Sequence, residues 1–367
     1  MKVVEVTNTD FALRHFLLPL MRAGRARGHD MIGVAPEGAL LEVARAEGFR
    51  VIALPFVRRL SPTAHLASFR SLLATFRAER PDLVHAHMPI SGFLTRIAAR
   101  GAGVPRVAYT CHGYLFRQPA RWSTRIATLA MEWVGGRFTD TYLTVSEADA
   151  TLARRLRICH RVEVVSNGRD PGTFHPDPAA RARIRTSLAT PPGRVAIVIV
   201  SRLVRQKGYP ELLEAMQVVP EAELWVVGER LASDRGPDLS PLFATSGLAE
   251  RLKMLGYRED VPAILAAADI FVLPSHFEGL PMVVIEAMLS GLPVVASDIP
   301  GPREQVLPGV TGILVPPADP EALAAALGTL AASPEKRLSM GLEGRARAIT
   351  CYDEAKVIAR TLDHLGL

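Results

Sequence analysis

The sequence lacks any apolar run that could cross a membrane. Its longest uncharged apolar stretches, such as VAIVIV at 195–200, fall far short of the roughly 20 residues that a spanning helix needs. Cysteine is also scarce: Cys111, Cys159 and Cys351 are odd in number and far apart, which argues for a reducing cytoplasm and against a disulfide framework. Lys2 leads directly into the strand-like VVEV with no cleavage-type site, so a signal peptide is not expected.

The chain is long enough for two domains, and its charge is divided unevenly between its two halves. Residues 1–170 contain 24 Lys and Arg against 14 Asp and Glu, a net charge of +10, whereas the remainder contains 19 against 23, a net charge of −4. Two interpretations remain open. The basic residues reflect a genome-wide bias toward arginine codons, or the surface of the first half binds anionic lipid or another polyanion.

Short β-branched runs alternate with helical patterns along the whole chain, which is typical of parallel sheets covered by helices. Gly and Pro cluster at 166–180, where we expect a linker between two doubly wound α/β domains. A final helix, roughly 352–365, has no strand of its own. The expected strands are KVVEVT, DMIGVA, RVIALP, DLVHAH, RVAYTC, DTYLTVS and VEVVSN, then RVAIVIV, ELWVVG, LKMLGY, IFVLP, PVVAS and GILVP.

Ligands of such sheets bind beyond the carboxyl ends of the strands, so the residues that follow each strand are the candidates. The turn after the first strand, TNTDFALRH, contains no glycine, which excludes the dinucleotide fingerprint of a nicotinamide dehydrogenase. Thr9 or Asp10 is a plausible helix N-cap there.

Three histidines follow later strands of the first half. We expect His85 and His87 to point to opposite faces of their strand, one into the core and one into the cleft, which makes a metal site unfavourable. His112 and Gly113 end the next strand; the glycine permits a sharp turn, and the imidazole can bond a sugar hydroxyl or a phosphate oxygen.

Cations and carboxylates mark two turns of the second half. Arg202 and Lys207 flank a tight connection into a helix expected near Gly208, which suits a diphosphate, although no P-loop pattern is present. Glu278 precedes a helix expected to begin near residue 280 or 281, whose first amides could bind an anion. Glu286 lies in an apolar run and needs strong partners, which a ribose cis-diol could supply.

These residues resemble a known family. SRLVRQKG, HFEGLPMVVIEAMLSGLPVVASDIPGPREQV and NGRD…FHP are similar to the C-terminal domain of retaining glycosyltransferases of family 4, which have the GT-B fold, and the glutamates have that family's E-x7-E spacing. DLVHAHMPISGFLTRIAARGAGVPRVAYTCHGYLF resembles the first domain of the bacterial branch that builds lipid-linked oligosaccharides and exopolysaccharides. The resemblance covers nearly the whole chain. It implies two Rossmann-like domains facing a cleft: an acceptor domain, 1–168, to which helix 352–367 returns, and a nucleotide-sugar domain, 169–351.

The resemblance also implies roles for individual residues. Arg202 and Lys207 would hold the donor diphosphate, and Glu286 the ribose. Glu278 would hold the transferred sugar, and His112 would contact the sugar or the acceptor near the anomeric carbon. The implied donor site consists of Arg202, Lys207, Tyr257, Arg258, Gly279, Leu280, Pro281, Met282 and Glu286; Asn8, Thr9 and His87 would lie on the first-domain side of the cleft.

One turn departs from the family pattern. Many members have a Gly-Gly turn after the first strand, but here it reads TNTD, followed by RHFLLPLMRAG, which resembles a bacterial sub-branch that uses nucleotide-activated N-acetylhexosamines. The implied activity is retaining transfer of a hexose or N-acetylhexosamine from a nucleotide-diphosphate sugar, with UDP favoured, to a lipid-linked saccharide. A soluble acceptor and a non-catalytic nucleotide-sugar-binding subunit stay open, while an epimerase would lack the E-x7-E pair.

No D-x-D motif is present, so transfer without a metal ion or other cofactor is expected. Two stretches, 55–70 and 114–127, mix arginine with large apolar residues. They predict contact with an anionic membrane surface through Arg117, Arg121 and Trp122, and the alternative is ordinary amphipathic helices whose apolar faces are buried against the sheet. The protein would then be cytoplasmic and peripheral on the inner face of the cell membrane. No nucleic-acid partner is expected.

Overall fold

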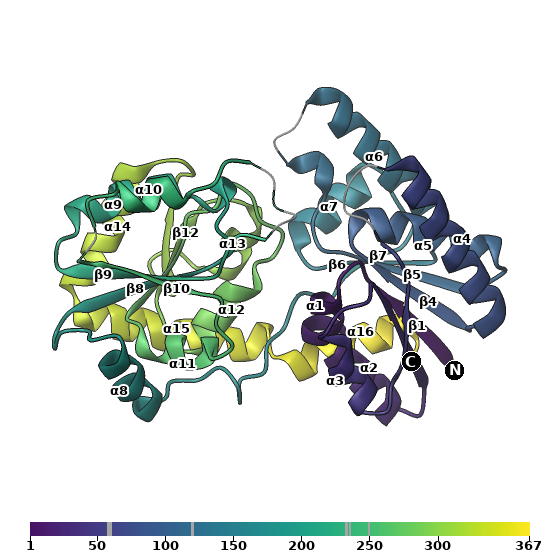
Figure 1. Ribbon diagram of the computed structural model, residues 1–367, viewed down its shortest axis with the longest axis horizontal. Helices are drawn as coiled ribbons and strands as arrows, with labels where there is room; N and C mark the ends of the chain where they lie inside the picture. The colour runs from purple at the N-terminus through teal and green to yellow at the C-terminus, as the bar shows by residue number, and fades with distance from the viewer. Residues whose placement is uncertain (57–60, 119–120, 232–233, 235, 249) are drawn as a thin grey trace. The chain divides into compact units, whose positions relative to one another are not determined.

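The computed structural model describes residues 1–56, 61–118, 121–231, 234, 236–248 and 250–367 (Figure 1). The chain divides into two compact units: unit 1 is Met1–Ser166 with Lys356–Leu367, and unit 2 is Asn167–Ala355. The predicted linker at 166–180 contains the first of these boundaries. None of the described helices combines the length and apolar character that a bilayer crossing needs.

Unit 1 is built on a parallel sheet in the order β3-β2-β1-β4-β5-β6-β7. The order reverses beside β1, so the carboxyl ends of β1 and β4 form a switch point where ligands of such sheets commonly bind. Its strands are β1 (Lys2–Val6), β2 (Asp30–Ala35), β3 (Arg50–Ala53), β4 (Leu83–His87), β5 (Arg106–Cys111), β6 (Thr141–Thr144) and β7 (Val162–Val164).

Helices lie between these strands in the chain. They are α1 (Asp10–Ala12), the π-helix η1 (Leu13–Leu17), α2 (Leu18–Ala26), α3 (Leu41–Ala46), α4 (Pro62–Glu79), α5 (Pro89–Gly101), the 3-10 turn η2 (Leu115–Arg117), α6 (Trp122–Gly136), α7 (Glu147–Arg155) and, from the far end of the chain, α16 (Glu354–Leu365). Val3 belongs to a buried cluster with Leu365 of α16, whereas the next residue, Val4, belongs to a separate one with Phe76 of α4. Successive strand residues point to opposite faces, so both faces of this sheet are buried.

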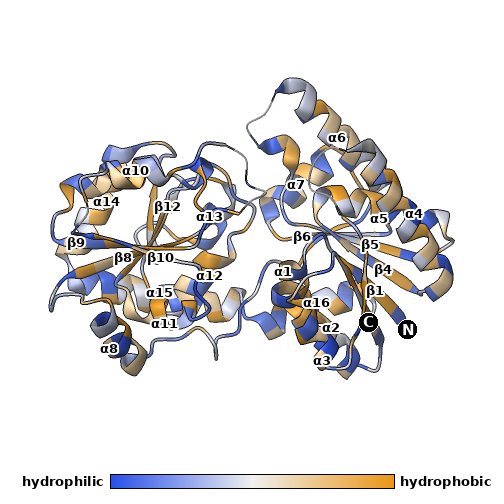
Figure 2. Cartoon of the chain, in the orientation of Figure 1, coloured by the Kyte–Doolittle hydropathy of each residue, from blue (hydrophilic) through white to orange (hydrophobic). Residues whose placement is uncertain are grey.

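Unit 2 repeats the plan with a parallel sheet in the order β10-β9-β8-β11-β12-β13, so its switch point lies at the carboxyl ends of β8 and β11. Most of the strands are nearly continuous apolar runs, largely orange in Figure 2, as expected where helices cover both faces. They are β8 (Val195–Val200), β9 (Ala222–Val227), β10 (Leu252–Gly256), β11 (Ile270–Leu273), β12 (Val294–Ser297) and β13 (Gly312–Val315).

The helices of unit 2 are α8 (Pro178–Ser187), the 3-10 turn η3 (Arg205–Lys207), α9 (Tyr209–Ala215), the 3-10 turn η4 (Met216–Val218), α10 (Ser240–Ala244), α11 (Val261–Ala267), α12 (Met282–Leu289), α13 (Pro300–Gln305), α14 (Pro320–Ala332) and α15 (Pro334–Cys351). The predicted α/β class is confirmed, since every predicted strand run overlaps one of the thirteen strands of the described chain.

Candidate functional site

The switch point of unit 2 brings together two side chains that the sequence places 71 residues apart. Lys207 follows β8 and Glu278 follows β11, and Lys207 Nζ donates to Glu278 Oε1 over 2.6 Å. The two side chains keep only 15% and 11% of their surface exposed. A cation for phosphate and a carboxylate for hydroxyls therefore meet at the edge where the sheet architecture favours a ligand.

Gly208 allows this close approach. Its φ of +76° lies in the left-handed region, and a Cβ placed there would lie 2.0 Å from the carbonyl oxygen of Pro274, at the end of β11. Only glycine permits both the backbone conformation and the contact. The turn after β8 is thereby held against the segment that leads to Glu278.

The start of α12 is fixed by bonds to its preceding loop. Pro281 is the N-cap and the helix begins at Met282, one residue after the later of the two predicted starting positions. Asn167 Nδ2 donates to the Leu280 carbonyl over 2.8 Å, and the Gln305 amide donates to that of Pro281 over 2.9 Å. These bonds occupy carbonyl oxygens. The Val284 amide donates to the Pro281 carbonyl over 3.3 Å, whereas no described residue accepts from the amides of Met282 and Val283, which remain as anion donors.

Glu286 has a partner that the sequence analysis missed. Arg169 Nε donates to Glu286 Oε1 over 2.6 Å, and the carboxylate side chain is only 8% exposed. This pair explains how a carboxylate is tolerated in the apolar face of α12. Arg169 lies within the NGRD segment that carried the family resemblance, but nothing local in the sequence connects it with residue 286.

Other residues of the predicted donor site have partners of their own. The Arg202 guanidinium pairs with Asp234 while keeping 44% of its side chain exposed. Arg258 forms two hydrogen bonds of 2.7 Å with Asp260, and the neighbouring Tyr257 is exposed. Among the described residues, neither Tyr257 nor Arg258 shares a hydrogen bond or ion pair with Lys207 or with the two glutamates of the E-x7-E motif.

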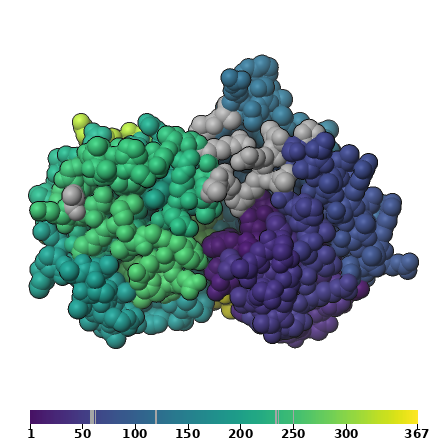
Figure 3. Space-filling view, viewed as in Figure 1, coloured from purple at the N-terminus to yellow at the C-terminus, as the bar shows by residue number. Residues whose placement is uncertain are grey.

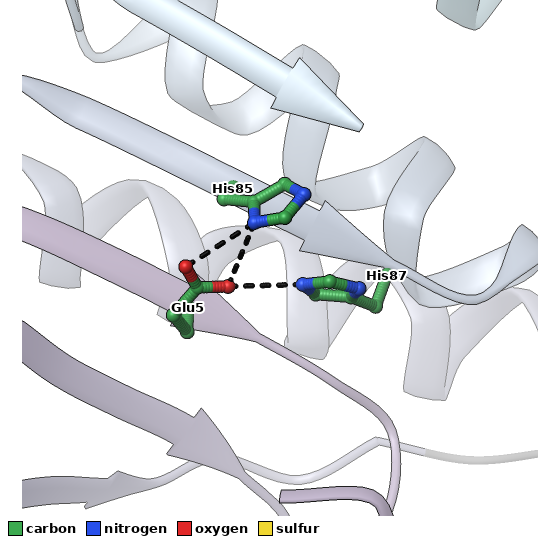
Figure 4. A group of neighbouring side chains, drawn as sticks. All are labelled: Glu5, His85 and His87. Atoms are coloured by element: carbon green, nitrogen blue, oxygen red, sulfur yellow. Dashed lines mark hydrogen bonds and ion pairs between the residues drawn. The ribbon is translucent and has the colours of Figure 1, made fainter. Parts of the chain in front are cut away.

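In unit 1, three histidines lie in one hydrogen-bonded network at the switch point of β1 and β4. Glu5 Oε2 lies 2.9 Å from His85 Nδ1 and 2.9 Å from His87 Nε2, as Figure 4 shows. His85 Nε2 lies 2.8 Å from Thr110 Oγ1, and His87 Nδ1 lies 3.2 Å from His112 Nε2. The expectation that His85 and His87 face opposite sides is wrong, because residues two apart on a strand share a face. Both are buried, so His87 is not an open cleft residue.

Burial and neighbouring charge act together on the pKa values in this network. Burial alone would raise the pKa of Glu5, but the charge and hydrogen bond of His85, together with those of His87, lower it to about 2. Burial and the charge of His85 lower the pKa of His87 to about 4 despite the opposing influence of Glu5. Burial, then the charges of His87 and His85, lower the pKa of His112 to about 3. At neutral pH, Glu5 is therefore ionised while His87 and His112 are neutral.

Glu5, His85 and His87 could also bind a metal ion together. They form the one such group among the described residues, because the atoms that would bind the metal lie within 4.8 Å of one another. The histidine nitrogens, however, lie at hydrogen-bond distance from the same carboxylate oxygen. The three side chains thus satisfy one another. Independence from metal stays a prediction.

The turn after β1 supplies a helix cap and part of a cavity. Thr9 Oγ1 accepts from the Ala12 amide over 3.0 Å, which confirms Thr9 as the N-cap. Asn8 lines a cavity of about 150 Å³ within unit 1, whose other lining residues are Phe56, His65, Pro89, Ile90, Ser91, Leu94 and Leu115.

The predicted membrane residues divide into two kinds. Trp122 is 76% exposed and Ile126 58%, and Arg121 lies beside them, at the start of a helix that stands clear of the rest of the unit 1 surface in Figure 3. Arg117 is instead paired with the buried Asp149 over 2.7 Å. Of the other predicted stretch, 55–70, residues 57–60 lie outside the described part of the chain.

Comparison with known families gives one match for each unit. A model described as "Glycosyl transferase 4-like domain" matches residues 13–168, and one described as "Glycosyl transferases group 1" matches residues 180–347. The latter range contains Lys207, Glu278 and Glu286, and the former contains His112.

Individual relatives and a solved structure agree with these family matches. A UDP-Gal:alpha-D-GlcNAc-diphosphoundecaprenol alpha-1,3-galactosyltransferase of Escherichia coli is 32% identical over 66% of this chain and 65% of its own length. A GDP-mannose-dependent alpha-(1-6)-phosphatidylinositol monomannoside mannosyltransferase of Mycolicibacterium smegmatis is 30% identical over 88% and 86%. The crystal structure of Anabaena HepE in complex with UDP superposes with a TM-score of 0.85 at 23% identity, covering all of both chains, a likeness of fold.

Proposed function

Because the chain belongs to the glycosyl transferases of group 1, with the GT-B fold, we propose that it moves a hexose or N-acetylhexosamine, with retention of configuration, from a UDP-sugar to a lipid-linked saccharide. The Lys207–Glu278 pair at the switch point of unit 2 carries this proposal. It joins a phosphate-binding cation to a hydroxyl-binding carboxylate beside the free amides of α12.

The pair suggests how the donor is received. A diphosphate approaching Lys207 competes with Glu278 for the ammonium group, because both are anions. As the phosphate takes the lysine, the Glu278 carboxylate is released to accept hydrogen bonds from hydroxyls of the transferred sugar. The amides at the start of α12 and the exposed Arg202 then stabilise charge on the departing diphosphate.

The nucleoside end of the donor fits the second glutamate. Arg169 holds one oxygen of the Glu286 carboxylate, which fixes the direction of the group. A carboxylate held in this way can accept from the two hydroxyls of a ribose. Two relatives favour UDP as the nucleotide of the donor: HepE was solved in complex with UDP, and the galactosyltransferase is named for UDP-Gal. The mannosyltransferase, by contrast, is named for GDP-mannose.

A lipid-linked acceptor is supported by two independent observations. The galactosyltransferase and the mannosyltransferase are both named for acceptors with a lipid portion. In this chain, residues 121–127 at the start of α6 are all exposed and include Arg121, Trp122, Arg125 and Ile126. Arginine beside large apolar side chains suits an anionic lipid surface, and residues 1–170 carry a net charge of +10.

The test is a donor and acceptor screen with the purified full-length protein. UDP- and GDP-activated hexoses and N-acetylhexosamines are supplied with a saccharide linked through diphosphate to a prenol, or with the free saccharide. We expect UDP release coupled to transfer onto the lipid-linked acceptor, with the donor's anomeric configuration kept in the product's proton NMR spectrum. Leu338→Ser, at an exposed position of α15, is the matched control and keeps full activity.

Three results would count against the proposal. Inverted product configuration would remove the retaining mechanism, and transfer only to the free saccharide would favour a soluble acceptor. Tight binding of nucleotide sugar with neither transfer nor hydrolysis would instead indicate a non-catalytic binding subunit.

A further inference from the structure

The histidine network of unit 1 extends from a buried carboxylate to the partly exposed His112. Glu5 lies opposite His85 in the register of β1 and β4, and His87 lies opposite Thr110 in that of β4 and β5. Glu5, His85, His87 and Thr110 therefore share one face of the sheet, and His112, one residue beyond the end of β5, joins them through its contact with His87. This shared face explains why a chain of hydrogen bonds crosses three neighbouring strands.

The hydrogen-bonding capacity of these groups permits one arrangement of protons around His87. Ionised Glu5 can only accept, so His87 must donate to it from Nε2. A neutral imidazole carries a single N–H, which leaves His87 Nδ1 as an acceptor. The group 3.2 Å from this nitrogen is His112 Nε2, which must therefore carry the proton.

We propose that Glu5 and His87 are positioning residues that fix His112 as the tautomer protonated at Nε2, leaving its Nδ1 as the hydrogen-bond acceptor for a ligand. Among the described residues, no hydrogen bond reaches His112 Nδ1, and the side chain is only partly buried. Gly113, with a φ of +119°, turns the chain away immediately after it. The geometry thus leaves Nδ1 of the neutral, oriented His112 ring free to accept a hydrogen bond from a ligand.

The fixed tautomer restricts which groups His112 can bind. Nδ1 requires a donor, so a sugar hydroxyl is suitable, whereas an unprotonated phosphate oxygen is not. This statement about the ligand rests on the proposed glycosyl transfer and assigns His112 to a hydroxyl of the sugar or acceptor rather than to the donor diphosphate. The tautomer itself does not depend on that proposal.

The tautomer can be measured without substrate. Full-length protein labelled with [15N]histidine is examined by long-range proton–nitrogen NMR at pH 7.5, and the His112 signals are assigned by their loss in His112→Gln. We expect neutral His112 with its proton on Nε2. In His87→Phe, this fixed state should give way to a tautomer mixture, whereas Thr110→Val, which removes only the bond at His85 Nε2, should leave His112 unchanged.

A double-mutant cycle separates positioning from general support of the fold. His87→Phe should lower kcat by about 10- to 100-fold in the native background, the range found when a group that orients a metal-bound histidine is removed. It should lower kcat by less than about twofold when His112 is already glutamine, because nothing is then left to position. If the phenylalanine variant does not fold, His87→Gln replaces it, and the spectrum of the native protein still decides the tautomer.

Three outcomes would overturn the inference. The first is His112 protonated at Nδ1 in the native protein. The second is an equal kcat loss from His87→Phe in both backgrounds, which would make the residue merely structural. The third is stoichiometric Zn²⁺ binding to the purified protein with loss of the protons from the His85 and His87 nitrogens that face Glu5. If the tautomer is found as expected but no donor supports transfer, the proposed function fails and the positioning of His112 stands.

Discussion

Replacing Arg169 with methionine removes the only charged group that the structure shows bonded to Glu286 among the described residues. The carboxylate side chain then stays 8% exposed with an uncompensated charge. Removing one member of a buried pair costs about 3–5 kcal/mol, and we take about 3 kcal/mol because Arg169 itself keeps some exposure. For a unit the size of 167–355, each kcal/mol lowers Tm by about 2–4 °C, so we expect a fall of about 6–12 °C.

Differential scanning calorimetry of the purified full-length protein measures this change. The matched control is Arg169→Met combined with Glu286→Gln, which removes both charges and should recover most of the lost stability. The reasoning fails if the single variant melts within about 1 °C of the native protein, or if the double variant is as unstable as the single one. Either result would mean that the pair is not a coupled buried ion pair.

Three further predictions concern activity and location. Arg202→Ala and Lys207→Ala should each lower transfer by about 30- to 1000-fold, because each removes a charge-assisted contact to the leaving diphosphate; near-normal turnover in both would refute the assignment. Transfer should survive EDTA, and a loss that Mn²⁺ or Mg²⁺ restores would show a metal requirement. Binding to anionic vesicles in co-sedimentation should fall with salt and weaken in Arg121→Ser/Trp122→Ser but not in Leu338→Ser; equal recovery with neutral vesicles would contradict it.

The strands could be predicted from the sequence because their signal is local. VAIVIV, IFVLP and the other β-branched runs are short, continuous and bounded by turn residues. This pattern is typical of a strand that is buried on both faces. The positions of Lys207 and Glu278 after such strands were also enough to place both at the carboxyl edge of one sheet.

The pairings at both sites could not be predicted in the same way. Arg169 and Glu286 are 117 residues apart, and Glu5 is a lone acid inside the apolar strand VVEV. Finding their partners requires the strand order and register, which depend on tertiary packing. The error over His85 and His87 was of another kind, since the two-residue period of a strand already places both on one face.

Helix α16 makes unit 1 discontinuous in the chain, and this affects how the protein emerges from the ribosome. Residues 1–166 are made first, but the Leu365 side chain that fills their buried cluster is added only after all of 167–355. Unit 2, being contiguous, can complete its core while unit 1 still exposes the apolar surface that α16 covers. A chaperone that binds the nascent chain should therefore hold the N-terminal segment longest, and premature termination near residue 355 should release a folded unit 2 joined to an unfinished unit 1.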